Sequence, residues 1–395
     1  MRNWTKITNP SSPLYLCGFR PFFLLTAGYS ALLLLGLILQ FSITYTLWHP
    51  PTPFWFVHEL LFGVSLAMLA GFLLTAFPAW TDSLRVKSTQ LQRLVLCWLM
   101  ARVSMGCATI ITMFPTIVFN VLFFVLLLSA LAPAVRDKRY QRHRLFFYQL
   151  LLYFFVMLSG YWFWMTGDKH QTLAILHTGV GVLIILLLTI LSRLSMVVVN
   201  HALLKYGETT QKHLAKPPRR NFAIGIIICY LTANWWLPQS SIAGWLALAC
   251  AASVLNILND WHLTKAWRDL YYQIGYSIYV LIAAAFALIG INNIWSLSTV
   301  NIDVTWLFSG PIGLAIALIM LVVGQKHSGH QLEYGVAIKW LMLSVWVFAL
   351  STLFTISNLW LPLIIASCSA MLSAILYLHL NWKTHSRPRC DGKEG

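Results

Sequence analysis

Residues 55–63 read WFVHELLFG, and they begin a stretch that stays apolar as far as Pro78. His58 and Glu59 are adjacent in this stretch, and both side chains are costly to bury in an apolar medium. An imidazole can ligate a metal through a ring nitrogen, and a carboxylate can orient that imidazole or bind a cation. HELLF lacks the second histidine of the zinc-protease pattern HExxH, which excludes that chemistry. The pair therefore indicates a buried site, with an anion near the start of a helix as the alternative for Glu59.

The composition places this pair in a membrane protein. The chain has 395 residues, of which 59% are hydrophobic and 10% are charged, and its mean hydropathy is +0.72. Soluble globular proteins carry about 25% charged residues. A helix rises about 1.5 Å per residue and a hydrocarbon core is about 30 Å thick, so each crossing needs about 20 apolar residues. The expected fold class is therefore all-α and polytopic.

Twelve apolar runs are expected to form transmembrane helices. They lie approximately at 21–41, 55–78, 91–112, 115–134, 145–165, 173–199, 221–237, 242–258, 270–291, 304–323, 336–356 and 359–380. The loops between them are too short for a second, soluble domain. We therefore expect a single integral membrane domain over residues 1–395, with a cytoplasmic N-terminal segment at 1–20 and a cytoplasmic tail at 381–395.

Lysine and arginine residues are concentrated in every second loop. One set of loops carries nearly all of them, including the block RDKRYQRHR at 136–144, and the opposite set carries only Lys169. Short loops rich in these residues stay in the cytoplasm, so both termini are expected there. The formal net charge of +16 follows from this topology, with an attraction to the lipid bilayer, and indicates no nucleic-acid partner. The seven cysteines lack CxxC spacing, so no disulfide framework or zinc site is predicted.

Two histidines are expected at similar depths below the outer surface. His58 lies about three residues into the second run and His177 about four residues into the sixth, a difference in depth of only a few ångströms. His49 and His170 fall in outer loops near the same level, whereas histidines such as His327 lie roughly a membrane thickness away. His58 and His177 could therefore share one site.

The second, sixth and tenth runs begin in a similar way. Each starts with a polar residue followed by a glycine: His58 and Gly63, His177 and Gly181, Thr305 and Gly310. The three starts are about four helices apart, which suggests three pseudo-repeats of four helices. A glycine just below a histidine lets a flat group such as a haem approach the backbone, and close helix packing is the alternative.

Arg102 falls within an apolar run, and Arg20 lies just before the first one. Arg102 is expected near the middle of the run 91–112, where a charge costs roughly 2.5–3.5 kcal/mol. It therefore needs a buried partner, and either Glu59 or a haem propionate would serve, with a purely structural pair or extension of the side chain to the interface as the alternatives. Arg20 lies nearer the inner face, where its side chain is expected to extend to the headgroups.

Four motifs resemble those of the NnrS family. They are GFRPFF at 18–23, HELLFG at 58–63, GFLLTAFPAWT at 71–81 and HSG at 327–329, and they follow one another in the family's order. The resemblance implies a haem- and copper-containing protein of the bacterial inner membrane that acts in the response to nitric oxide. The twelve-run layout is also similar in architecture to the catalytic subunit of haem-copper oxidases.

The resemblance and the depth of the histidines together identify candidate site residues. We predict His58 as an axial haem ligand, and the predicted metal ligands are His58, His177, Glu59 and His49. The predicted cofactor contacts are His58, His177, Arg102, Gly63 and Gly181. No catalytic residue and no protein partner is predicted, and nitric oxide is the expected small ligand.

Departures from the family pattern leave other functions open. Thr305 stands where family members, as we align them, usually have a histidine. Only four histidines lie on the outer side, fewer than two haems and a copper would need. A secondary transporter would also have about twelve spans and a few buried charges, and a cofactor-free membrane interaction protein is a third possibility.

Overall fold

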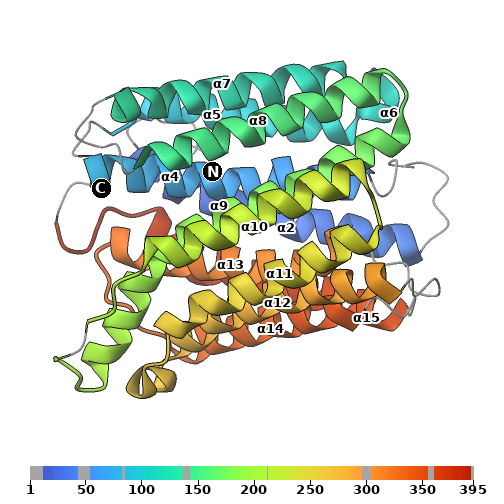
Figure 1. The fold of residues 1–395 in the computed structure, drawn as a ribbon. Coiled ribbons are helices and arrows are strands. Elements are labelled where there is room, and N and C mark those ends of the chain that lie inside the picture. The colour runs from blue at the N-terminus through green and yellow to red at the C-terminus, as the bar shows by residue number, and fades with distance from the viewer. Residues whose placement is uncertain are drawn as a thin grey trace. The chain divides into compact units, whose positions relative to one another are not determined.

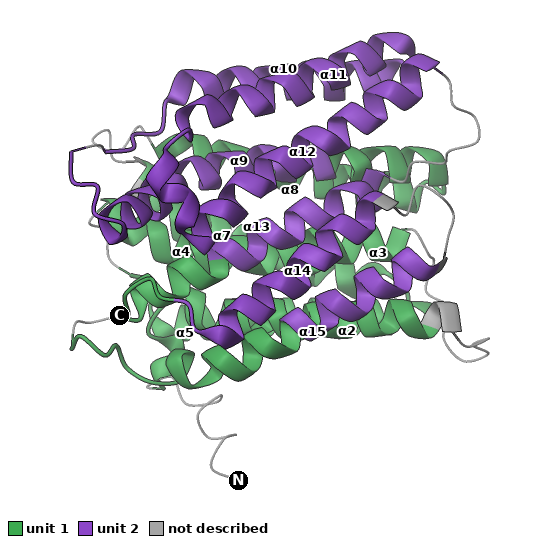
Figure 2. Cartoon of the chain, turned by 90° about the horizontal axis from the view of Figure 1, so that it is seen from below, with its two compact units in different colours: residues 1–179, 320–333, 374–395 green, residues 180–319, 334–373 purple. Residues whose placement is uncertain are grey.

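The structure of the chain is a computed structural model that describes residues 12–42, 54–81, 85–136, 143–210, 212–295, 304–354 and 360–392. In these residues every regular element is a helix (Figure 1), as the apolar runs predict. The helices group into two compact units (Figure 2). Unit 1 comprises Met1–Gly179, Met320–Glu333 and Ala374–Gly395, and unit 2 comprises Val180–Ile319 and Tyr334–Ser373.

Unit 1 contains the N-terminal helices. They are the 3-10 turn Pro13–Tyr15, α2 (Phe19–Ser42), α3 (Phe54–His58), the π-helix Glu59–Ser65, α4 (Leu66–Thr81), α5 (Ser88–Gly106), α6 (Ala108–Ile111), α7 (Phe114–Arg136) and α8 (Arg144–Met165). Three long helices contribute residues to both units: α9 (Lys169–Lys205), α13 (Val304–His327) and α15 (Trp360–His385).

Unit 2 contains the remaining helices. They are α10 (Pro217–Trp236), α11 (Ser241–Ile257), the 3-10 turns Leu258–Asp260 and Thr264–Arg268, α12 (Leu270–Trp295) and α14 (Val336–Phe354). Within this unit α11 packs against both α10 and α12.

Ten of the described helices are long and apolar enough to cross a membrane, so the chain is a multi-pass membrane protein. The expected twelve spans are therefore too many. The run at 91–112 forms α5, which carries Arg93 and Arg102 and already ends at Gly106. The run at 221–237 lies in α10, whose first turn holds Arg219 and Arg220. These side chains reduce the apolarity of both helices below that of a span, although both pack along neighbouring helices, α5 on α7 and α10 on α11.

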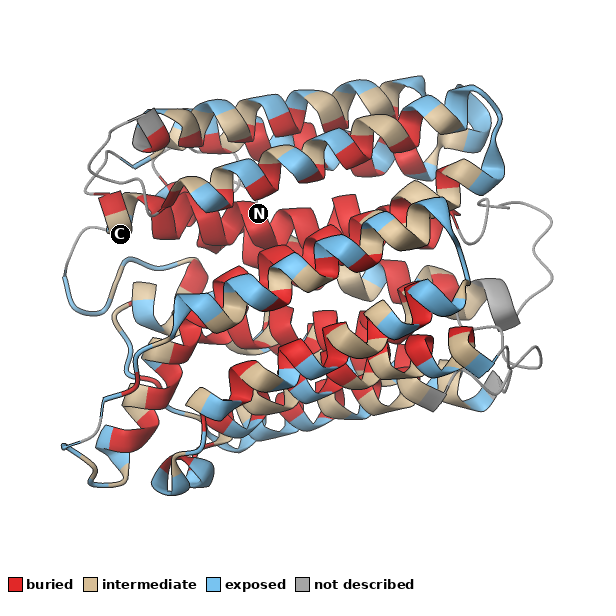
Figure 3. Ribbon diagram, in the orientation of Figure 1, coloured by how far each residue is buried: buried red, intermediate tan, exposed pale blue. Residues whose placement is uncertain are grey.

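Two of the sequence motifs form the contact between α2 and α4. A Cβ atom at Gly71 would lie 2.9 Å from the ring of Phe23, and one at Gly18 would lie 2.5 Å from Cβ of Leu74. The two glycines therefore allow a close approach that a side chain would prevent. In unit 1, α4 is buried along most of its length, whereas α7 and α8 alternate buried and exposed residues (Figure 3).

Arg20 is fully buried and holds the end of α15. Its Nη1 donates to the carbonyl oxygen of His385 at 3.2 Å and to that of Arg387. The last carbonyl groups of a helix have no donor within the helix, so this guanidinium satisfies acceptors that would otherwise be unpaired. The expected extension of Arg20 to the headgroups is therefore wrong. The single domain, its terminal segments and the threefold repeat stay predictions.

Gly310 provides a test of the packing in unit 2. A Cβ atom there would lie 2.3 Å from Oγ1 of Thr352 and 2.8 Å from the carbonyl oxygen of Ala349, both on α14. Because backbone cannot move aside as a side chain can, Gly310→Ala should lower the thermal unfolding midpoint in detergent.

The matched control is Gly225→Ala in α10, where an added Cβ would have no atom within 4 Å in the described residues, apart from the adjoining backbone of its own helix. Alanine should stabilise that helix by roughly 0.5–1 kcal/mol. Equal unfolding midpoints for the two variants would contradict the close contact of α13 with α14.

Candidate functional site

The HELLFG motif forms a short π-helix between two α-helical segments. α3 ends at His58, the π-helix covers Glu59–Ser65, and α4 continues from Leu66. π-helices are rare, and they occur often at functional sites. Their wider turn alters the positions that side chains would have in an α-helix. His58 and Glu59 are 1% and 0% exposed, so the pair lies in the interior of unit 1.

Glu59 accepts hydrogen bonds from three side chains. Its Oε2 accepts from Nη1 of Arg102 at 2.7 Å and from the hydroxyl of Tyr29, and its Oε1 lies 2.7 Å from Nδ1 of His58. Arg102 is also buried. Of the two partners that the sequence suggests for Arg102, the structure shows Glu59. Its expected place at mid-span is wrong, because α5 ends one turn later, at Gly106.

The hydrogen bonds continue from Arg102 and return to His58. Nη2 of Arg102 donates to Oδ1 of Asn120 at 2.5 Å, and Nδ2 of Asn120 donates to the hydroxyl of Tyr161 at 2.7 Å. That hydroxyl lies 2.8 Å from Nε2 of His58. Side chains from α3, the π-helix, α5, α7 and α8 therefore form one closed ring, which we call the Glu59 ring: His58, Glu59, Arg102, Asn120 and Tyr161.

The donors and acceptors of the Glu59 ring can be assigned. A guanidinium can only donate, so Oδ1 of Asn120 faces Arg102 and its amide N–H group faces Tyr161. The hydroxyl of Tyr161 accepts from Asn120 and keeps its own proton to donate to Nε2 of His58. Nδ1 of His58 then carries the ring proton and donates to the Glu59 carboxylate. In the neutral imidazole of His58 the lone pair is therefore on Nε2.

Aromatic rings and a glycine surround the ion pair. Cζ of Arg102 lies 5.7 Å from the ring centroid of Trp98 and 5.8 Å from that of Tyr29, and Nε1 of Trp98 donates to the carbonyl oxygen of Gly63 at 3.0 Å. A Cβ atom at Gly63 would lie 2.7 Å from Tyr29 and 2.8 Å from both Arg102 and Glu59. Gly63 therefore leaves space that these side chains fill, and its predicted position beside a haem stays a prediction.

The other predicted residues lie elsewhere. His177 is partly exposed on α9, and a Cβ atom at nearby Gly179 would lie 3.0 Å from Leu61 of the π-helix. α9 therefore passes close to the segment that follows His58. A Cβ atom at Gly181, in unit 2, would lie 2.5 Å from Leu231 of α10, a contact between packed helices. His49 lies outside the described residues.

Three residues of the site were not predicted from the sequence. Asn120 is a single amide within the apolar run 115–134, and a polar residue in such a run is itself a signal of a buried site. Tyr29 and Tyr161 gave no signal, because the chain has 15 tyrosines and many lie near helix ends.

The described residues differ in their suitability as ligands. At Nδ1, His58 has the geometry of a metal-binding histidine. Such a histidine donates the N–H of its non-ligating nitrogen to a partner such as a carboxylate, as Nδ1 does to Glu59. Both oxygens of Glu59 accept from protein groups. Within the described ranges, no group of three or more histidine, cysteine, aspartate or glutamate side chains could hold a metal ion.

The ion pair can be tested by removing one charge. Arg102→Met should leave Glu59 ionised and buried without a counter-charge, which costs about 3–5 kcal/mol of folding stability. We expect a lower folded yield and a lower unfolding midpoint in detergent, whereas Arg85→Met, at an exposed arginine, should behave like the parent protein. The double variant Glu59→Gln/Arg102→Met should lose less than the sum of the two single variants. Additive losses would show that the two charges do not interact.

Comparison with known proteins identifies the family. The sequence model of the NnrS protein family matches residues 13–389, which is nearly the whole chain and includes every motif on which the resemblance rests. No curated protein matches the sequence. The resemblance inferred from the motifs is confirmed, and the chain belongs to the NnrS protein family.

Proposed function

We propose that this protein binds haem in the bacterial inner membrane and acts in the response to nitric oxide, with His58 as an axial ligand. The observation that carries the proposal is the hydrogen bond between Nδ1 of His58 and Glu59 at 2.7 Å. It directs the lone pair of the imidazole to Nε2, the nitrogen that would face the iron. Family membership supports the same assignment.

The surroundings of His58 suit a small apolar ligand. Its ring stacks on Phe54 with centroids 5.7 Å apart and meets the edge of Phe62 at 5.3 Å. Nitric oxide is small and neutral, so it needs no charged route to reach an apolar interior. The haem would supply the iron that binds it, and the protein would supply the ligand and the apolar surroundings.

Tyr161 is hydrogen bonded to the nitrogen of His58 that would bind an iron. Its hydroxyl lies 2.8 Å from Nε2 of His58 and is held by Asn120. Haem binding therefore requires this hydroxyl to move away from the imidazole. In the structure Tyr161 keeps Nε2 hydrogen bonded, which avoids an unpaired acceptor in the interior.

Further parts of the proposal rest on the family and on loop charge. His177 would be a second ligand from α9, and Arg102 would act through Glu59. Copper, with Glu59 and His49 as further ligands, is implied by the resemblance. Both termini are assigned to the cytoplasm because the loops rich in lysine and arginine lie on their side.

The ligand assignment can be tested by visible absorption. His58→Ala should lose the Soret band per folded protein, His177→Ala should lose or shift it, and His327→Ala should leave it unchanged. His327 is the matched control because it is the last residue of α13, in the HSG motif. Loop charge predicts that it lies on the opposite side of the membrane from His58. A parent-like spectrum for His58→Ala would show that His58 is not the ligand. A purified parent protein without any Soret band after haem addition would instead favour a transporter or a cofactor-free protein.

The role of Tyr161 gives a second test. Tyr161→Phe removes the hydroxyl from Nε2 of His58 but keeps the ring, so haem should bind the cofactor-free protein about three- to tenfold more tightly, as expected for one hydrogen bond. Tyr153→Phe is the control, since Tyr153 is fully buried on the same helix and its hydroxyl has no hydrogen-bond partner in the described residues. Weaker binding by Tyr161→Phe than by Tyr153→Phe would show that the hydroxyl supports the haem site instead.

A further inference from the structure

Unit 1 has a hollow on its surface where α5 packs along α7. Its volume is about 110 Å³, and it is lined by Gln90, Arg93, Leu94, Leu126, Ser129 and Ala130. Three of these side chains are polar and three are apolar. One ligand in this hollow would therefore meet both kinds of surface, as an amphiphile requires.

Arg93 gives the hollow a positive charge. Its side chain is exposed, and it forms no ion pair with another described residue. Arg85 and Lys87 precede α5 and are exposed as well, and the first turn of α5 contains no acidic residue. The charge at this end of α5 is therefore not neutralised by the described protein groups, and it favours an anionic ligand.

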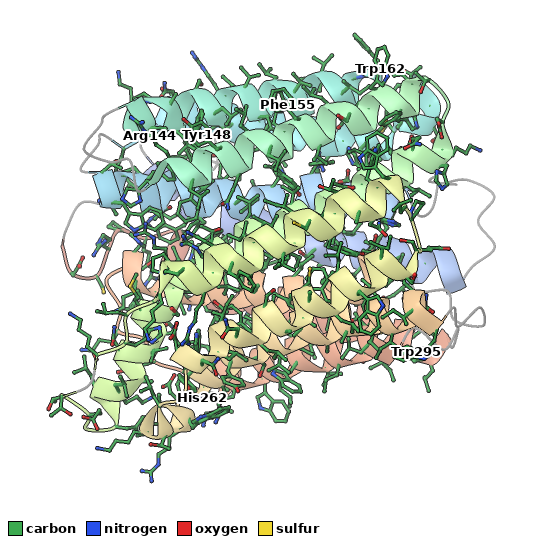
Figure 4. The ribbon with its side chains drawn as sticks, in the orientation of Figure 1. Arg144, Tyr148, Phe155, Trp162, His262 and Trp295 are labelled. Atoms are coloured by element: carbon green, nitrogen blue, oxygen red, sulfur yellow. The ribbon has the colours of Figure 1, made fainter. Side chains whose placement is uncertain are left out.

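The hollow lies near the basic ends of its helices. α5 begins at Ser88, close to Gln90, and α7 is followed by the block RDKRYQRHR at 136–144. Nε of Arg144, at the start of α8, donates to the carbonyl oxygen of Val135 near the end of α7 at 3.0 Å. Figure 4 shows Arg144 at one end of α8 and Trp162 at the other. Loop charge assigns the basic end to the cytoplasmic leaflet, which carries anionic lipids.

We propose that this hollow binds the headgroup of an anionic phospholipid. The guanidinium of Arg93 can form two parallel hydrogen bonds to the phosphodiester, and the amide of Gln90, one turn earlier on the same face, can donate another. An acyl chain would lie along Leu126, which is partly exposed, and continue over Leu122, which is 41% exposed on the next turn of α7.

Ser129 favours a headgroup that carries hydroxyl groups. Its Oγ donates to the carbonyl oxygen of Leu126 at 2.8 Å, so the oxygen remains an acceptor for a donor on the ligand. A glycerol headgroup offers such a donor beside the phosphate. Phosphatidylglycerol therefore matches the lining better than a lipid whose headgroup carries a quaternary ammonium.

The test is lipid binding by the full chain after delipidation in detergent, measured by native mass spectrometry during titration with phosphatidylglycerol. Arg93→Gln should weaken binding about tenfold, as expected for a charge-assisted pair. Ala130→Leu should also weaken it, because the larger side chain fills the hollow without changing any charge. Arg268→Gln, at an exposed arginine outside the hollow, should bind as the parent does. The unfolding midpoint of each variant without lipid establishes that it is folded.

Three results would overturn the proposal. One is equal binding of phosphatidylcholine and phosphatidylglycerol by the parent protein, which would remove the need for an anion. Another is unchanged binding by Arg93→Gln and Ala130→Leu. The third is complete displacement of the lipid by millimolar inorganic phosphate, which would identify a site for small anions instead.

Discussion

The burial of Arg102 beside Glu59 is the constraint on which the architecture of unit 1 depends. Removing two charges from water costs several kcal/mol for each ion, and their attraction repays this only when the remaining donors and acceptors are also satisfied. Asn120 and Tyr29, from α7 and α2, meet part of this requirement, whereas Nε of Arg102 has no hydrogen-bond partner among the described residues. The ion pair thus requires polar side chains at defined places on otherwise apolar helices, and it fixes how those helices face one another.

The π-helix lets Glu59 meet the requirements of the buried ion pair. Glu59 must reach Arg102, Tyr29 and the imidazole of its own neighbour, His58, at once. A regular α-helix places adjacent side chains about 100° apart, which separates such a pair. The π-helical segment begins at Glu59 and includes Gly63, where the lack of a side chain leaves space for the arginine. The irregular backbone and the glycine therefore both allow the Glu59 ring to close.

Much of this fold follows from composition, because an apolar run of about 20 residues has few alternatives to a helix. Each of the twelve runs does contain a helix. The number of spans is a different question, since Arg93 and Arg102 in α5 and Arg219 and Arg220 in α10 lower the apolarity of helices that still pack beside others. The pairing of Arg102 with Glu59 was also predictable, because a buried charge needs a buried partner. The ring itself was not, since His58 and Tyr161 are 103 residues apart and nothing in either segment specifies the other. Arg20 shows the same limit, because its acceptors lie at the far end of the chain.

The ion pair also determines the state of the histidine. Arg102 can only donate and ionised Glu59 can only accept, which orients the amide of Asn120 and places a proton on Nδ1 of His58. Asn120 then donates to the hydroxyl of Tyr161, and the neutral imidazole of His58 accepts from that hydroxyl at Nε2. The lone pair on Nε2 is thus set by charges that do not contact that nitrogen. A histidine that binds a metal needs this tautomer, so under the proposed function the ion pair would also hold His58 in the form that ligates.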